Sequence, residues 1–305
     1  MAFTAADVKA LREMTGVGML DCKKALAETD GDMDKAVEFL REKGLAAAQK
    51  KAGRIAAEGM AYAEVFSDGA ALVEVNAETD FVAKNDKFVA FVKEATQVIM
   101  KQNPADVEAL MACKTENGET VDEALKNLIL VIKENIKVRR FVRYEGVCSA
   151  YVHGGGTHGI LVNFETTNGI EAKDEFVTYG KDIAMQVAAA NPGYVDEASV
   201  PAEVVAKEKE IMLAQMAGDP KTANKPEAVK QKMIEGKIKK FFKENCLVDQ
   251  EFVKDSDLTV AQYTAKVAKD LGGDIKIVKF TRFQKGEGLE KRADDFAAEV
   301  ASMVK

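Results

Sequence analysis

The chain has 305 residues, of which 47% are hydrophobic and 30% are charged, a balance typical of a globular protein with a substantial core. A chain of this length corresponds to about two domains. Its formal net charge of −7 opposes broad affinity for nucleic acid, because phosphate backbones are bound by clustered Lys and Arg. No direct nucleic-acid partner is therefore expected, and the basic run from Lys237 to Lys240 is interpreted as a solvated helix face.

The sequence shows no signal for a membrane or for a bound cofactor. Residues 1–9 lack the apolar stretch of a signal peptide, and no run approaches the roughly 18 apolar residues of a membrane span. A cytoplasmic protein is predicted. The four cysteines are scattered without Cys-x-x-Cys spacing or a His at ligand spacing, so buried, reduced thiols are expected and neither a metal nor a cofactor is. They are Cys22, Cys113, Cys148 and Cys246.

Residues 1–45 predict a domain of three short helices. Thr4 and Asp7 form a capping-box pattern at the start of the first helix. Gly44 is expected to end the third helix, because glycine readily adopts the left-handed conformation that terminates helices. Residues 46–58 are then a helical or mobile linker.

The loop between the first two predicted helices carries apolar residues that so small a domain covers poorly. This tip, Val17 to Leu20, is flanked by Arg12 and Lys23. An apolar tip rimmed by cations is typical of a docking surface, so Arg12, Met19, Leu20 and Lys23 are candidate partner-binding residues. The alternative is that Met19 and Leu20 complete the small helical core.

Two parts of the chain repeat one another. Asp86–Phe91 recurs as Asp174–Tyr179, and Asn103-Pro104 recurs as Asn191-Pro192, each 88 residues later (174 minus 86). Each copy predicts a β-hairpin, a loop and a helix. The first hairpin is marked by an Asp-Gly turn between two alternating apolar runs.

The repeat predicts a core of two subdomains, one of which is interrupted. The first subdomain is assigned to residues 59–145, and the second to residues 146–193 and 247–285. Between the two parts of the second, residues 194–246 predict an arm of two antiparallel helices with facing apolar residues. Projecting helical hairpins commonly serve association, so self-association or partner binding through the arm is expected.

The loop after the first hairpin differs between the copies. Thr79-Asp80-Phe81 aligns with Thr167-Asn168-Gly169, so the second copy has a turn-type Asn-Gly where the first has Asp-Phe. The unit can therefore be built without an acid and an aromatic there. Thr79, Asp80, Phe81 and Val82 are candidate contacts with a partner. The alternative is that Phe81 is a core residue and Asp80 a helix cap.

The glycine-rich loop of the second hairpin, residues 153–159, matches two enzyme motifs. Its G-x-G-x-x-G pattern joins two strands, whereas a dinucleotide fingerprint joins a strand to a helix. Its His-Gly-Gly-Gly matches an esterase loop, but the chain has no Gly-x-Ser-x-Gly to supply a nucleophile. Both matches are set aside. His153 is taken as a surface contact, with a structural histidine as the alternative.

The end of the chain predicts a separate module. Residues 286–305 are assigned to it, with Gly286-Glu287-Gly288 as a swivel. Asp294 to Met303 predicts an amphipathic helix, and Phe296 lies on its apolar face as a further candidate contact.

Two long signatures in order along the chain resemble the elongation factor Ts family of bacterial translation factors. The first runs from Leu11 to Met19 and continues in Asp21–Leu26, and the second combines Glu74–Asn76 with Thr79–Lys84. The resemblance implies an α+β fold along nearly the whole chain. Its parts would be a ubiquitin-associated-like N-terminal domain of three helices, a duplicated α/β core with antiparallel sheets, an inserted coiled-coil arm and a C-terminal helix.

The same resemblance implies a nucleotide exchange factor for the GTPase elongation factor Tu, with no catalysis of its own. In the family, the pair matching Asp80-Phe81 intrudes near the partner's magnesium site. The residues matching His153, the Met19-Leu20 tip and the C-terminal helix touch its nucleotide domain. Thr157-His158 departs from the family's usual basic and aliphatic pair. The competing interpretations are a plain protein-interaction module and a hydrolase using the His-Gly-Gly-Gly loop, which the missing nucleophile motif opposes.

Overall fold

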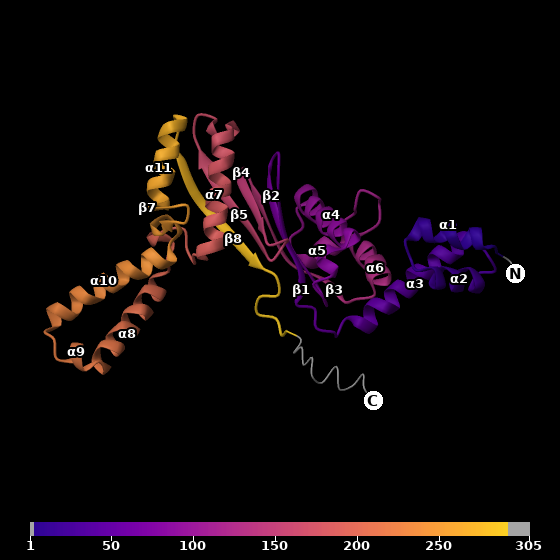
Figure 1. Cartoon of the computed structure of the whole chain (residues 1–305), viewed down its shortest axis with the longest axis horizontal. Coiled ribbons are helices and arrows are strands. Elements are labelled where there is room, and N and C mark those ends of the chain that lie inside the picture. The colour runs from indigo at the N-terminus through magenta and orange to yellow at the C-terminus, as the bar shows by residue number, and fades with distance from the viewer. Residues whose placement is uncertain (1–2, 292–305) are drawn as a thin grey trace.

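The computed structural model describes residues 3–291, in which two antiparallel three-stranded sheets lie between two helical ends (Figure 1). One sheet has the order β1-β2-β3 and the other the order β4-β5-β8. The strands are β1 (Glu58–Phe66), β2 (Gly69–Ala77), β3 (Ile136–Glu145), β4 (Val147–His153), β5 (His158–Thr166), the short pair β6 (Glu251–Phe252) and β7 (Asp255–Thr259), and β8 (Ile275–Gln284). The predicted antiparallel sheets are thus confirmed; the β6–β7 pair was not anticipated.

Helices flank the sheets and form both ends of the molecule. They are α1 (Ala5–Thr15), α2 (Met19–Glu28), α3 (Met33–Lys51), α4 (Asp86–Gln102), α5 (Val107–Ala112), α6 (Val121–Ile132), α7 (Asp174–Ala190), α8 (Ala202–Gly218), α9 (Pro220–Ala223), α10 (Glu227–Asn245) and α11 (Val260–Leu271). Within the described residues, none of these helices is both long and apolar enough to cross a membrane.

The N-terminal helices begin and end largely as their residues predict. Thr4 caps α1 in a reciprocal capping box with Asp7. Gly16 ends the helix in the left-handed conformation. The prediction that Gly44 ends α3 is wrong, because the helix continues to Lys51. A Cβ at Gly44 would lie 3.3 Å from the Lys126 carbonyl oxygen, so this glycine permits close packing of α3 on α6.

The three N-terminal helices pack against the rest of the molecule. Leu130 of α6 lies in their apolar core beside Leu11 and Leu40. The Lys87 ammonium donates to the Gly16 carbonyl oxygen at 3.2 Å, and Lys133 pairs with Asp21 at 3.3 Å. The N-terminal helices therefore share a packed interface with the first subdomain.

The duplication is visible in the structure. A 3₁₀ helix precedes the long helix in each copy, η1 (Val82–Lys84) before α4 and η2 (Ile170–Ala172) before α7, again offset by 88 residues (170 minus 82). Asn103 and Asn191 end α4 and α7 with nearly the same left-handed backbone, at φ values of 46° and 45°. The predicted repeat of hairpin, loop and helix is confirmed.

The two sheets pack against each other through a shared apolar cluster. It contains Leu72 of β2 and Leu161 of β5, both fully buried. The glycine-rich loop is part of this interface, since Gly156 accepts a hydrogen bond from the Ala61 amide at 2.8 Å. A Cβ at Gly159 would come within 2.6 Å of Leu72 Cδ1. These glycines are thus explained by close sheet packing rather than by phosphate binding.

The arm leaves the second subdomain as a hairpin of α8 and α10 joined by α9 (Figure 1). Met216, Ile234 and Ile238 form its own small buried cluster. Its base is closed by the Leu247 amide, which donates to the Tyr194 carbonyl at 2.9 Å. The predicted antiparallel helices are therefore present.

The four cysteines are free, as predicted. Cys22 and Cys246 are buried, while Cys113 and Cys148 are half-buried.

Candidate functional site: exposed apolar residues on braced loops

Among residues 3–291, Phe81 is the large apolar side chain that the fold leaves most open. It is 79% exposed, and Asp80 beside it is exposed as well. The alternative of a core Phe81 is therefore wrong. Asp80 is not a helix cap either, because Asn85 caps α4 through its side-chain oxygen and the Lys87 amide.

The loop that carries Phe81 is held by hydrogen bonds from distant residues. Thr79 donates from its amide at 3.0 Å and from its hydroxyl at 2.7 Å to the two carboxylate oxygens of Glu134. Glu78 accepts from the Asn135 amide at 2.6 Å and pairs with Arg54 at 3.4 Å. An aromatic side chain is thus exposed on a loop whose backbone is fixed in advance, which lowers the entropy lost on binding.

Val82 does not lie on the exposed surface, contrary to its selection as a contact residue. Its side chain is only 5% exposed and packs in the core of the first subdomain. It anchors the loop from below while Phe81 points outward. The contact set of this loop is corrected to Thr79, Asp80 and Phe81, with Thr79 itself half-buried.

A groove of about 580 Å³ lies next to the Phe81 loop. It is lined by Thr79, Asp80 and Phe81 of the loop and also by Lys285 and Lys291. The lining therefore combines an aromatic ring with the acidic residues Glu58, Glu78 and Asp80 and with two lysines, of which Lys285 pairs with Glu58.

The N-terminal tip is a second exposed apolar surface. Leu20 is 76% exposed and Met19 is 55% exposed, with Arg12 and Lys23 exposed around them. The alternative that Met19 and Leu20 complete the helical core is wrong. Val17, expected to belong to the uncovered tip, is instead buried.

The tip and the Phe81 loop share neighbours. Lys87, which donates to the Gly16 carbonyl at 3.2 Å, lies in the first turn of α4 just after the loop. Lys133, which pairs with Asp21, directly precedes the Glu134 that holds Thr79. Sequence reasoning missed Glu134 and Asn135, because a polar pair at a helix-to-strand turn carries no signal of a partner 55 residues away.

His153 is exposed at the end of β4, and its Nδ1 lies 3.0 Å from the Tyr151 hydroxyl. It pairs across the hairpin with His158, whose ring centroid is 6.1 Å away. Burial, followed by the charge of Arg282, lowers the pKa of His158. His158 is therefore biased toward the neutral form beside the exposed His153.

Two further points concern the remaining candidates. Phe296 lies outside the described residues. Within residues 3–291, no group of three or more His, Cys, Asp or Glu side chains is arranged to hold a metal ion.

The fold and these surfaces define a class of duplicated, two-sheet α+β proteins that carry exposed apolar side chains on braced loops. Residues 78–287 match the family model described as elongation factor TS. The elongation factor Ts of Clostridioides difficile (strain 630) is 48% identical over 307 residues, covering 99% of each chain. That of Clostridium novyi (strain NT) is 50% identical over 305 residues, covering 97% of each. The chain belongs to the elongation factor Ts family and has the role of a translation elongation factor.

Proposed function

We propose that the chain is a guanine-nucleotide exchange factor that binds elongation factor Tu carrying GDP and promotes GDP release, acting in the cytoplasm during translation. The carrying observation is Phe81, 79% exposed on a loop fixed by Glu134 and Asn135. The exposed ring adds nothing to the chain's own core, although its loop is held by four hydrogen bonds and ion pairs to distant residues. A partner that receives the ring explains the arrangement.

The proposed mechanism needs no covalent chemistry and no cofactor on this chain. Magnesium neutralises nucleotide phosphates and is the largest local charge in such a site. An aromatic wedge and a carboxylate from Phe81 and Asp80 would disturb the magnesium and phosphate contacts of the partner. Because coupling between two ligands is reciprocal, a factor that binds the nucleotide-free partner more tightly must weaken GDP binding.

The parts of the chain receive roles under this proposal. Residues 1–45 serve as a ubiquitin-associated-like docking domain whose contacts are Arg12, Met19, Leu20 and Lys23. Residues 46–58 connect it to the duplicated core, 59–145 and 146–193 with 247–285. The hairpin 194–246 is a coiled-coil arm for association, and 286–305 is a C-terminal contact module that includes Phe296. His153 adds a contact from the second subdomain.

The test is direct. Purified chain is mixed with elongation factor Tu loaded with fluorescent GDP, and nucleotide release is followed by stopped flow. We expect release to accelerate, and the equilibrium affinity of elongation factor Tu for GDP to fall by a factor in the usual allosteric range of roughly 5 to 150. Calorimetry should show no tight GDP binding by the chain alone. Unchanged release at saturating chain would leave only a plain interaction module.

A further inference from the structure

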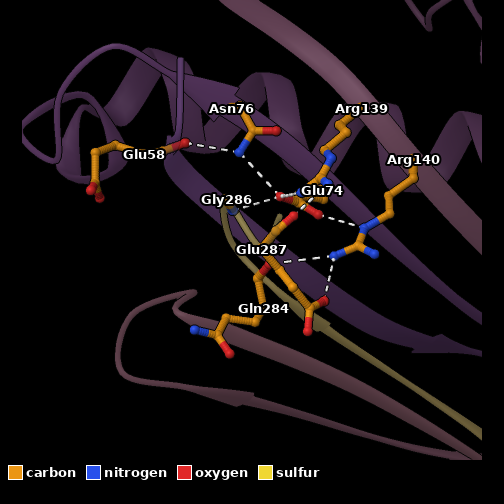
Figure 2. Close-up of polar contacts among 8 residues, drawn as sticks. All are labelled: Glu58, Glu74, Asn76, Arg139, Arg140, Gln284, Gly286 and Glu287. Atoms are coloured by element: carbon orange, nitrogen blue, oxygen red, sulfur yellow. Dashed lines mark hydrogen bonds and ion pairs between the residues drawn. The ribbon is translucent and has the colours of Figure 1, made fainter. Parts of the chain in front are cut away.

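A fully buried carboxylate, Glu74, lies at the centre of a polar cluster on β2 (Figure 2). Its Oε1 accepts from Arg139 Nη1 at 2.9 Å, from Asn76 Nδ2 at 3.1 Å and from the Gly286 amide at 2.8 Å. Its Oε2 accepts from Arg140 Nε at 2.6 Å. Four donors from different parts of the chain therefore converge on one side chain.

The cluster joins the two halves of the core. Glu74 and both arginines belong to the first sheet, whereas residues 284–287 continue from β8 of the second. Arg139 Nη2 donates to the Glu287 carbonyl at 2.6 Å, and Arg140 Nη2 pairs with the Glu287 carboxylate at 3.2 Å (Figure 2). The segment predicted to be a swivel is thus anchored at Gly286 and Glu287.

The second copy of the repeat shows that this charge is not required by the unit. The pairing of β2 with β3 shifts register directly after Glu74, and the pairing of β5 with β8 shifts directly after Asn163, so the extra residues of the two bulges are Arg139 of β3 and Val278 of β8. Asn163 is a neutral amide that donates to the Glu145 and Val147 carbonyls. The bulge therefore forms without a carboxylate, and burying one is costly unless it is fully paired.

The charge of Glu74 adds a set of hydrogen bonds of defined direction that links the Phe81 loop to the His153 hairpin. On one side, Glu74 accepts a hydrogen bond from Asn76, which lies five residues before Phe81 in the chain. The Asn76 side chain also donates to the Glu58 carbonyl at 3.1 Å. On the other side, Gly286 lies two residues after Gln284, the last residue of β8. Gln284 pairs with His158 of β5, and His158 pairs in turn with His153 across the second hairpin. Apolar packing could hold the sheets together without defining this register.

We propose that Glu74 is a positioning residue for exchange, which sets the Phe81 loop and the His153 hairpin in one relative geometry through Arg139, Arg140 and Gly286. This inference rests on the proposed exchange function. Glu74 touches no nucleotide and no partner, because it is buried; it acts through the placement of the loops that do.

The test is Glu74→Gln, which keeps the shape and removes the charge. We expect GDP release from elongation factor Tu to slow by about tenfold at saturating chain, since contact groups misplaced by a fraction of an ångström lose much of their effect. Deuterium exchange at the Gly286 amide should rise in the free protein. The matched control is Asp182→Asn, another buried acid with two partners, Lys254 and Tyr263, which lies on α7 away from the cluster.

The coupling of the loops gives a second measurement. In the unaltered chain, Phe81→Ala and His153→Ala should be non-additive in GDP release, and in the Glu74→Gln chain they should become additive. Arg139→Gln is the milder variant should Glu74→Gln fail to fold, because Arg139 is partly exposed and Arg140 still pairs with Glu74.

The outcomes separate the two proposals. Normal release by Glu74→Gln and Arg139→Gln, with loss in Phe81→Ala, would overturn the positioning role and leave the exchange function intact. An equal loss in Asp182→Asn would show that general destabilisation is responsible and would also overturn it. If the unaltered chain does not accelerate GDP release from elongation factor Tu, the proposed exchange function itself is wrong.

Discussion

Phe81 and Phe88 lie seven residues apart and have opposite environments. Phe88 on α4 is completely buried, while Phe81 extends from the loop before it. Phe88 therefore contributes to the stability of the core, whereas the side chain of Phe81 remains available at the surface. Because exposure of Phe81 is maintained by Thr79 and Glu78 bonding to distant residues, its side chain can be altered without loss of the loop.

We predict that Phe81→Ala, alone or with Asp80→Ala, impairs nucleotide exchange far more than folding. The free energy of unfolding should change by no more than about 0.5 kcal/mol, as for other surface substitutions. Phe88→Ala is the control and should cost about 3–5 kcal/mol, as for buried phenylalanines. Thermal unfolding and stopped-flow GDP release are measured on both variants. A large loss of stability with near-normal exchange in Phe81→Ala would contradict the contact role.

At the scale of elements, the arm is a unit that closes its own small core. Met216, Ile234 and Ile238 pack between α8 and α10, and the chain enters and leaves at a narrow base where Gly193 and Tyr194 bond the Asn245 carbonyl. Little of the buried surface of the second subdomain depends on the helices themselves.

We expect that replacing residues 202–243 by a short Gly-Ser linker leaves a folded core with some exchange activity and reduces association with itself or with the partner. The reason is that Val205 and Phe242, near the two ends of the removed segment, pack against the same apolar cluster, so a short linker spans the ends with a small loop-closure cost. Circular dichroism tests whether the shortened chain folds, light scattering tests its association, and GDP release tests its exchange activity. Unfolding of the shortened chain at room temperature would instead assign the arm to the core.

For the whole molecule, the interface between the two sheets determines whether the halves unfold together. Leu72 and Leu161 fill it, and the glycine-rich loop closes against β1 through Gly156. The buried ion cluster around Glu74 lies at the same junction. These contacts favour one cooperative unfolding transition for the core.

Leu72→Ala is predicted to lower the free energy of unfolding by about 2–5 kcal/mol, as for other buried leucines, and to move the transition of both halves. Leu213→Ala makes the same chemical change on the exposed arm and should cost about 0.5 kcal/mol or less. Unfolding in urea is monitored by hydrogen exchange of the backbone amides, which reports the unfolding transition of each half of the core separately. Two separate transitions in the unaltered core would show that the halves are independent.

The sequence by itself determined the features that depend on local periodicity and on repetition. Alternation located the hairpins, with an Asp-Gly turn in the first and a glycine-rich loop in the second. Caps such as Thr4 with Asp7 located helix starts, and the 88-residue repeat identified the loop where Phe81 has no counterpart. The exposure of Phe81 was indicated by its missing counterpart in the second copy, and that of Met19 and Leu20 by the small size of the helical domain; the structure decided against the alternative of core residues.

Only the tertiary structure decided the features that depend on residues distant along the chain. Gly44 has the sequence signal of a helix end, but α6 lies against it and the helix continues. Val82 was grouped with Phe81, but successive residues entering the turn of η1 point in different directions, one inward and one outward. Glu74 belongs to a signature of the family resemblance, but its structural role could not be predicted, because a single acid in a strand shows that role only when Arg139 and Gly286 arrive from 65 and 212 residues away.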